Sequence, residues 1–161
     1  MPPYTIRACT SSDAPTIARH RVEMFRDMGE VPTERAAAAF LAASIPAIRT
    51  ELDRGSYYGW FAVSGGEQVI AGVGAHVKAT LPRMGADGLH VFSTAVPLVV
   101  NVYTEPNWRK RGLATALMRT LMQWAREQSF DRVVLHASDH ARSLYASLGF
   151  VPSNEMRWRL A

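Results

Sequence analysis

The sequence predicts an α/β (α+β) fold, with one mixed, mainly antiparallel central sheet flanked by helices. Three observations support this class. Runs rich in β-branched and aromatic residues are separated by stretches whose apolar residues recur three or four positions apart. In the first half of the chain, Gly65-Gly66 joins two consecutive strand runs as in a hairpin. The second half alternates strand and helix patterns, which favours parallel strands joined by crossover helices.

Two helices are predicted in the first half of the chain. Ser and Thr are preferred at the start of a helix and Gly just past its end. Both helices are bounded in this way, the first between Ser11 and Gly29 and the second between Thr33 and Gly55. Pro46 interrupts the second pattern and should kink that helix or split it in two.

The strands are predicted from the β-rich runs and the turn residues between them. In chain order they cover residues 4–9, 57–63, 68–80, 96–104 and 132–136, and further extended segments at 150–151 and 155–160 finish the chain. Residues 81–88 contain Pro82 and two glycines and are predicted to form a loop.

The clearest helix covers residues 111–128. Leu113, Leu117, Leu121 and Trp124 recur there on one face, so this helix should bury a broad apolar stripe against the sheet. A shorter helix with the same kind of spacing covers residues 139–148.

Length and composition bound the class of protein. With 161 residues, 48% of them hydrophobic and 20% charged, the chain is expected to form a single domain over residues 1–161. Its one cysteine, Cys9, cannot form an internal disulfide. No apolar run is long enough to span a membrane, and the first residues show no signal-peptide pattern, so we expect a cytoplasmic protein.

The formal charge of +4 favours an acidic or phosphorylated ligand. Of 18 basic residues only Lys78 and Lys110 are lysines, and arginine is the better bidentate partner for phosphate. The basic residues are scattered along the chain rather than gathered in one run. Specific binding of nucleic acid is therefore not expected.

The most informative segment is the turn between the strand at 96–104 and the helix that follows. The turn is basic, with Arg109, Lys110 and Arg111, and then small, with Gly112 and Ala114. The first N–H groups of a helix lack internal partners and carry partial positive charge, so such a turn can bind phosphate. No Gly-x4-Gly-Lys-Ser/Thr or Gly-x-Gly-x-x-Gly motif competes with it. A solvated basic helix start is the alternative.

Two motifs in sequence resemble the GNAT superfamily of acyl-CoA-dependent N-acetyltransferases. That family carries Arg/Gln-x-x-Gly-x-Gly/Ala at a helix start after a strand, and residues 109–114 read Arg-Lys-Arg-Gly-Leu-Ala. It then carries a strand, a helix with Ala and Tyr, and Gly-Phe, which here are residues 133–137, Ala141 to Tyr145, and Gly149-Phe150. The resemblance covers about residues 96–152 and implies a GNAT-like acyl-CoA N-acyltransferase fold.

The resemblance also implies how acetyl-CoA, the acyl-donor cosubstrate, would bind. The pantetheine arm would pair with the strand backbone like an added strand, and the pyrophosphate would sit on the N–H groups of the turn. The implied contacts are Val102, Tyr103 and Thr104 for the arm and Arg109, Lys110, Arg111, Gly112, Leu113, Ala114 and Thr115 for the phosphates. Seven residues before Tyr145, where the family often has an Asn that contacts pantetheine, stands Ser138. Ser138 either replaces part of that contact or caps the next helix.

Tyr145 occupies the usual general-acid position of the family, where its hydroxyl would face the CoA sulfur; a packed helix aromatic is the alternative. Glu105 is the candidate base, acting directly or through water, and a solvated loop carboxylate is its alternative. Further candidates around the acceptor are Glu23, His76, Tyr57, Tyr58 and Trp60, although strand aromatics are usually packing residues. His136 and His140 lack an obvious third ligand, so no metal site is expected.

The leading hypothesis is an N-acetyltransferase that moves an acetyl group from acetyl-CoA to a primary amine by direct attack, without a covalent enzyme intermediate. The acceptor would be a small-molecule or peptide amine, and a homodimer is an option that the family offers. A non-catalytic acyl-CoA-binding regulatory module is the alternative, since such a module would need the phosphate turn but no general acid.

Overall fold

The computed structural model describes residues 4–85, 87–92, 95–158 and 160. Three sequence predictions extend beyond these residues. The N-terminal pattern includes residues 1–3, the loop predicted at 81–88 includes Ala86, and the extended end at 155–160 includes Arg159; these positions lie outside the described residues.

The helices that the structure describes lie close to the predicted positions. They are η1 (Ser11–Asp13), α1 (Ala14–Asp27), α2 (Glu34–Asp53), η2 (Pro106–Trp108), α3 (Leu113–Glu127), η3 (Asp139–Ala141) and α4 (Arg142–Ser147). The Thr33 hydroxyl accepts a hydrogen bond from the Ala36 N–H at 3.1 Å, which confirms Thr33 as the cap of α2.

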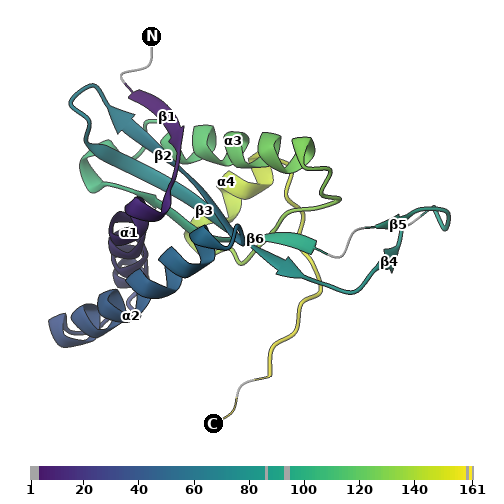
Figure 1. Cartoon of the computed structure of the whole chain (residues 1–161), viewed down its shortest axis with the longest axis horizontal. Helices are drawn as coiled ribbons and strands as arrows, with labels where there is room; N and C mark the ends of the chain where they lie inside the picture. The colour runs from purple at the N-terminus through teal and green to yellow at the C-terminus, as the bar shows by residue number, and fades with distance from the viewer. Residues whose placement is uncertain (1–3, 86, 93–94, 159, 161) are drawn as a thin grey trace.

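The central sheet has five described strands in the order β1-β2-β3-β6-β7 (Figure 1). Their bounds are β1 (Tyr4–Ala8), β2 (Tyr57–Ser64), β3 (Val69–Ala79), β6 (Ala95–Thr104) and β7 (Val134–Leu135). Neighbouring strands are antiparallel except for β6 and β7, which are parallel. The mixed, mainly antiparallel sheet predicted from the sequence is confirmed.

The helices cover both faces of this sheet (Figure 1). On one face, α1 and α2 pack around Tyr57 and Phe61 of β2. On the other face, α3 and Tyr145 of α4 pack against β2, β3 and β6 in the main core. Leu117 and Leu121 of α3 are fully buried there, as their spacing predicts.

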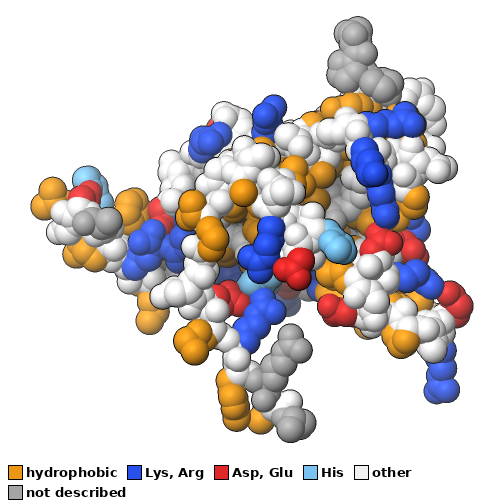
Figure 2. All heavy atoms as spheres, turned by 180° about the vertical axis from the view of Figure 1, so that it is seen from behind, with side chains coloured by type: hydrophobic (Ala, Val, Ile, Leu, Met, Phe, Trp, Pro, Cys, Tyr) orange, Lys and Arg blue, Asp and Glu red, His pale blue; other side chains and the backbone are white. Residues whose placement is uncertain are grey.

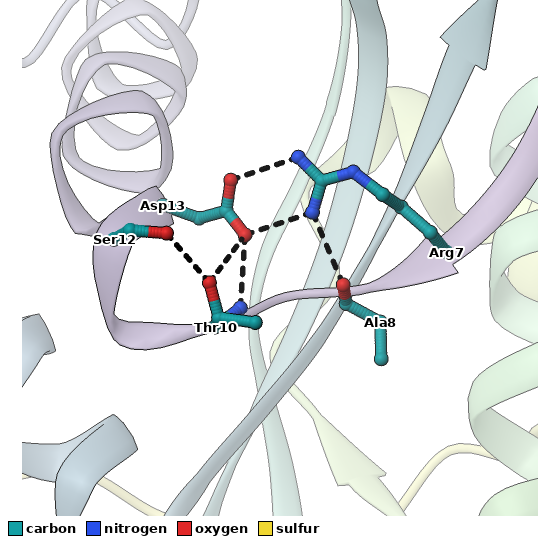
Figure 3. Close-up of polar contacts among 5 residues, drawn as sticks. All are labelled: Arg7, Ala8, Thr10, Ser12 and Asp13. Atoms are coloured by element: carbon teal, nitrogen blue, oxygen red, sulfur yellow. Dashed lines mark hydrogen bonds and ion pairs between the residues drawn. The ribbon is translucent and has the colours of Figure 1, made fainter.

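The start of α1 is fixed by an ion pair with β1. The Asp13 carboxylate accepts two hydrogen bonds from the Arg7 guanidinium at 2.8 Å and one from the Thr10 N–H at 2.8 Å (Figure 3). These bonds to the charged form hold the pKa of Asp13 below its usual value, with the Arg7 bond as the largest cause. The contacts join the end of the first strand to the first turn of helix.

Pro46 does not split the second helix, and that part of the prediction is wrong. α2 continues through Pro46 to Asp53 as one element. Proline removes one N–H donor from the helix ladder. On either side, Leu41, Ile45 and Ile48 pack in the core under α2, and their burial outweighs the loss of a single hydrogen bond.

Two other segments differ from prediction. The predicted loop contains β4 (Arg83–Met84), which pairs with β5 (Val91–Phe92) in a small antiparallel arm that projects from the body (Figure 1). The predicted final strand is not formed: residues 151–158 belong to no helix or strand. A strand needs a neighbour to complete its hydrogen bonds, and no local sequence pattern supplies that neighbour.

Candidate cofactor and acetyl-transfer site

The strand β6 separates from β7 partway along its length. Its ladder with β7 consists of two residue pairs, Leu98 with Val134 and Val99 with Leu135. β6 then continues to Thr104, still paired on its other side with β3. From Val100 onward, one side of the β6 backbone therefore lacks a β7 partner. The Val100 and Thr104 carbonyls are bonded to arginine side chains, and the other backbone groups on this side can pair with an extended ligand.

A bulge lies where this separation begins. Asn101 faces Gly74 and Val99 faces Ala75, so Val100 is an extra residue on β6. Arg21 of α1 holds the bulge from one face of the sheet: its Nη1 donates to the Val100 carbonyl at 3.1 Å and to Asn101 Oδ1 at 2.8 Å. The break in the ladder is thus fixed by a side chain from the opposing helix.

Asn101 continues this contact into the core. Its Nδ2 donates to the Tyr57 hydroxyl at 2.9 Å, and both side chains are buried. Burial raises the pKa of Tyr57, so the phenol stays neutral. The chain of bonds from Arg21 through Asn101 to Tyr57 satisfies polar groups that would otherwise be costly to bury.

The turn after β6 presents the beginning of α3 at the end of this open edge. Gly112 is the N-cap of α3 and adopts a left-handed φ of 78°, which glycine tolerates best. A Cβ at Gly112 would have no atom within 4 Å, so the space over this position is open. Leu113, Ala114 and Thr115 follow in the first turn, whose N–H groups have no partner within the helix.

The three basic residues of the turn differ in their contacts. Arg109 turns back toward α1: its Nη2 lies 2.6 Å from Asp27, and its Nε donates to the Thr104 carbonyl at 3.0 Å. Arg111 lies over the Trp108 ring, 4.9 Å from its centroid, and is exposed, as is Lys110. The structure thus leaves Arg111 and Lys110 at the surface beside the helix start, while Arg109 fastens the turn to α1.

Tyr145 lies in the main core, in the same cluster as Leu113 of the turn and Val99 and Val102 of β6. Burial raises the pKa of its hydroxyl. Its ring meets Phe150 edge-on at 5.9 Å, and among the described residues no group forms a hydrogen bond with its hydroxyl. The ring is packed in the core, and the hydroxyl is left without a hydrogen-bond partner among the described residues.

Ser138 is the N-cap residue of η3 and is exposed. Its carbonyl accepts the Ala141 N–H at 3.0 Å, but its hydroxyl makes no capping hydrogen bond. The hydroxyl is therefore not committed to the helix start.

Glu105 lies where β6 meets the turn, on the α1 side of the sheet. Its Oε1 is 2.6 Å from Arg19 and 3.5 Å from Nε2 of His20, which is only 3% exposed. That ring nitrogen makes no hydrogen bond. Burial, with the charge of Arg19, lowers the pKa of His20 to about 4, although the Glu105 charge opposes the shift.

The remaining acceptor-side candidates are engaged in other contacts. Tyr58 and Trp60 stack on Trp124 of α3, with ring centroids 4.6 and 5.4 Å apart, which is the packing role that strand aromatics usually have. His76 Nε2 is 2.9 Å from Glu51, and Glu23 lies 3.5 Å from Arg26. Within the described ranges, no group of three or more His, Cys, Asp or Glu side chains is arranged to hold a metal ion.

Sequence reasoning missed His20, and it missed the contact between Arg21 and Asn101. One signal was available for Asn101: it is the one side chain of its apolar strand run that carries an amide. For Arg21 and His20 no local signal exists, because their partners lie some eighty residues away in the chain.

In the part of the chain that the structure describes, no helix is long and apolar enough to cross a membrane.

Comparisons with known proteins agree with this geometry. The sequence model described as the Acetyltransferase (GNAT) family matches residues 19–150. A rat protein named N-acetyltransferase 8B is 36% identical over 115 residues, which are 67% of this chain and 47% of that protein. Human N-acetyltransferase 8 is 33% identical over 101 residues, 61% of this chain and 40% of that protein. The chain thus spans less than half the length of these relatives.

Solved structures match over nearly the whole chain. A GCN5-related N-acetyltransferase from Ralstonia eutropha JMP134 superimposes with a TM-score of 0.84 at 29% identity, covering 98% of both chains. A predicted acetyltransferase from Clostridium acetobutylicum, solved with acetyl-CoA, has a TM-score of 0.80 at 20% identity, covers 98% of this chain and 96% of its own, and shares the fold. The motif residues lie on the open strand and the following turn, and the family model matches most of the chain. The chain therefore belongs to the GNAT acetyltransferase family.

Proposed function

We propose that the protein transfers an acetyl group from acetyl-CoA to a primary amine by direct attack of the amine on the thioester. One observation carries this proposal: the β6–β7 ladder ends at Val99, and the open strand edge leads directly to the start of α3. The solved relative from Clostridium acetobutylicum, which has the same fold, holds acetyl-CoA.

The residues present fit this cosubstrate. An extended pantetheine arm has amide groups that can pair with Val102, Tyr103 and Thr104 along the unpaired side of β6. The open space over Gly112 admits a pyrophosphate to the N–H groups of the first helical turn, where the helix dipole adds favourable potential. Arg111 and Lys110 lie at the mouth of this turn and would contact the outer phosphates, and Ser138 would offer its hydroxyl to the pantetheine.

The chain can assist the reaction at two atoms. When the amine attacks, negative charge grows on the thioester oxygen, and a β6 N–H near the Val100 bulge would stabilise it in the manner of an oxyanion hole. The departing sulfur then needs a proton, and the Tyr145 hydroxyl would donate it. A neutral phenol, kept so by burial, is the correct protonation state for this role.

The amine must lose a proton before or during attack, because a free alkylammonium has a pKa near 10.4. Glu105 is the carboxylate next to the open strand and would accept this proton through water. Its ion pair with Arg19 holds the side chain beside the end of β6. Replacement by Gln keeps the shape and removes the base, and should lower kcat at neutral pH, where the amine is protonated and needs a base.

The direct test is a thiol-release assay with acetyl-CoA and a broad panel of amines, paired with thermal melting in the presence of acetyl-CoA. We expect both amine-dependent thiol release and a raised Tm, since a ligand that binds only the folded chain stabilises it. A raised Tm without thiol release from any amine would favour a regulatory acyl-CoA-binding module. The absence of both thiol release and a raised Tm would contradict the proposal.

A further inference from the structure

His136 directly follows β7, at the point where β7 and β6 separate. The last described pair of their ladder joins Val99 to Leu135. One residue further along the two parallel strands stand Val100, the bulged residue of β6, and His136. With the phosphates at the start of α3, next to Thr104, a pantetheine arm along the open edge would bring its thioester end back toward Val100. His136 lies beside that position.

The His136 side chain lies on the α1 face of the sheet. Alternate side chains of an extended segment point to opposite faces. Val133, Leu135 and Ala137 all pack against the main core under α3. His136 stands between the last two, so it points to the other face, on which Val100 packs. The His136 side chain is 47% exposed, so a group from solvent can reach it there.

The two faces of the opening thus carry different groups. On the α3 face, Tyr145 packs in the main core together with Val99. On the α1 face stands the half-exposed imidazole of His136. An amine can therefore approach the thioester from the α1 face, while the proposed proton donor to the sulfur lies on the opposite face.

Glu155 determines which nitrogen of His136 is free. His136 Nε2 lies 2.7 Å from Glu155 Oε2, and Arg157 Nε donates to Glu155 Oε1 at 2.9 Å. The bond with His136 holds the pKa of Glu155 below its usual value, so this carboxyl is ionised and can only accept hydrogen bonds. The neutral imidazole must then carry its proton on Nε2. Nδ1 keeps its lone pair, and among the described residues no group forms a hydrogen bond with it.

We propose that His136 is the base that removes the second proton from the attacking nitrogen, and that Glu155 is its positioning residue. This inference rests on the proposed function. A primary ammonium loses two protons when it becomes an amide. The first leaves before attack, and Glu105 would accept it. The second leaves after the C–N bond has formed, because the nitrogen then carries a positive charge.

Nδ1 of His136 takes this second proton as the C–S bond breaks and Tyr145 protonates the sulfur. Histidine suits the task because it changes charge near neutral pH and can return the proton in every turnover. Of the two protons lost by the nitrogen, one replaces the proton that Tyr145 gives to the sulfur. The other is released to solvent, so the products are an amide, a free thiol and one proton.

His136→Ala in the full chain tests this proton transfer. At neutral pH, kcat for amine-dependent thiol release should fall about 100-fold. The rise in Tm caused by acetyl-CoA should be retained, because the imidazole acts only after the donor is bound. Added imidazole should restore part of the lost rate, since the side chain removed is half exposed. His140→Ala, at an exposed position four residues away, is the matched control and should keep kcat with or without added imidazole.

Glu155→Gln tests the positioning role. An amide can donate as well as accept a hydrogen bond, so it no longer fixes the proton on Nε2. We expect a fall in kcat smaller than that of His136→Ala. Nitrogen NMR of the imidazole should show the Nε2–H form of His136 in the unmodified protein and a loss of that preference in Glu155→Gln. A purely structural contact would leave the tautomer unchanged.

The outcomes separate this inference from the proposed function. If the unmodified protein releases thiol and His136→Ala keeps its kcat, the role of His136 is overturned alone. The same holds if added imidazole restores nothing, or if unmodified His136 carries its proton on Nδ1. Loss of the Tm rise in His136→Ala would place His136 in donor binding and would also overturn its role as base. An unmodified protein that releases no thiol with any amine would overturn the proposed function and this inference together.

Discussion

The contact between Gly74 and Tyr57 shows how a single missing side chain shapes the site. A Cβ on Gly74 would lie 1.8 Å from the Tyr57 hydroxyl oxygen. Glycine at this position therefore leaves room for the Tyr57 hydroxyl, which accepts a hydrogen bond from Asn101. Arg21 in turn donates hydrogen bonds both to Asn101 and to the bulge of β6. The bulge in β6 thus depends on Gly74 of the neighbouring strand, a residue that makes no side-chain contact itself.

Gly74→Ala should therefore destabilise the protein by about 1–3 kcal/mol, because the core must shift to accommodate the methyl group. Urea unfolding measures the change. Gly65→Ala is the control, since a Cβ there has no atom within 4 Å. Equal stabilities of the two variants would show that Tyr57 moves aside at no cost.

His20 makes the stability depend on pH in a defined interval. Its folded pKa is about 4, while an unfolded histidine titrates near 6.5. The unfolded chain therefore takes up a proton first as the pH falls. The contribution of His20 is fully present above pH 6.5 and is lost between 6.5 and 4, on the order of 3 kcal/mol.

His20→Gln should flatten the stability profile over this interval, measured by urea unfolding at a series of pH values. His140→Gln, at an exposed position, is the control and should leave the slope unchanged. A slope unaltered by His20→Gln would place the acid sensitivity in other groups.

Tyr145→Phe separates a general acid from a packed aromatic. The hydroxyl has no partner among the described residues, so its removal should change stability little. If it protonates the leaving sulfur, kcat should fall about 100-fold while the KM for acetyl-CoA stays the same. Tyr58→Phe, which keeps its stacking on Trp124, serves as the control. A kcat equal to that of the unmodified protein would leave Tyr145 only its packing role.

At the scale of elements, local patterns predicted the main helices and the positions of the sheet strands along the chain well. Leu113, Leu117 and Leu121 define α3 because a helix repeats its faces every 3.6 residues. The sequence could also locate the turn at Gly112. It could not show that Arg109 would bond Asp27 rather than face the solvent, because that contact joins segments 82 residues apart. The same limit applies to the predicted strand at 155–160: its alternating pattern is local, but the neighbour that a strand needs is not encoded locally.

Gly112→Ala tests the turn as an element. Because φ is 78°, the variant should cost about 1 kcal/mol of stability, and its methyl group would occupy the open space over the turn. The rise in Tm caused by acetyl-CoA should shrink or disappear. Gly88→Ala has a similar φ of 66° with equally open space and should retain the full rise. Equal rises in both variants would place the phosphates elsewhere.

At the scale of the whole molecule, stability comes from two apolar layers on opposite faces of one sheet. Leu121 is completely buried in the layer under α3. Leu121→Ala should lower the free energy of unfolding by about 2–5 kcal/mol. Arg119→Ala, an exposed position of the same helix, is the control and should change it by less than about 0.5 kcal/mol. Similar losses in both variants would contradict a core centred on α3.

Two ion pairs, Arg19 with Glu105 and Arg109 with Asp27, clamp α1 to both sides of the loop that begins α3. These pairs couple the loop to α1, so a donor whose phosphates bound at the turn, as proposed, would shift α1 together with the loop. Arrival of the donor would then reshape the side from which the amine comes, and the two substrates would add in a fixed sequence, donor first. High ionic strength would loosen the clamp and relax that sequence.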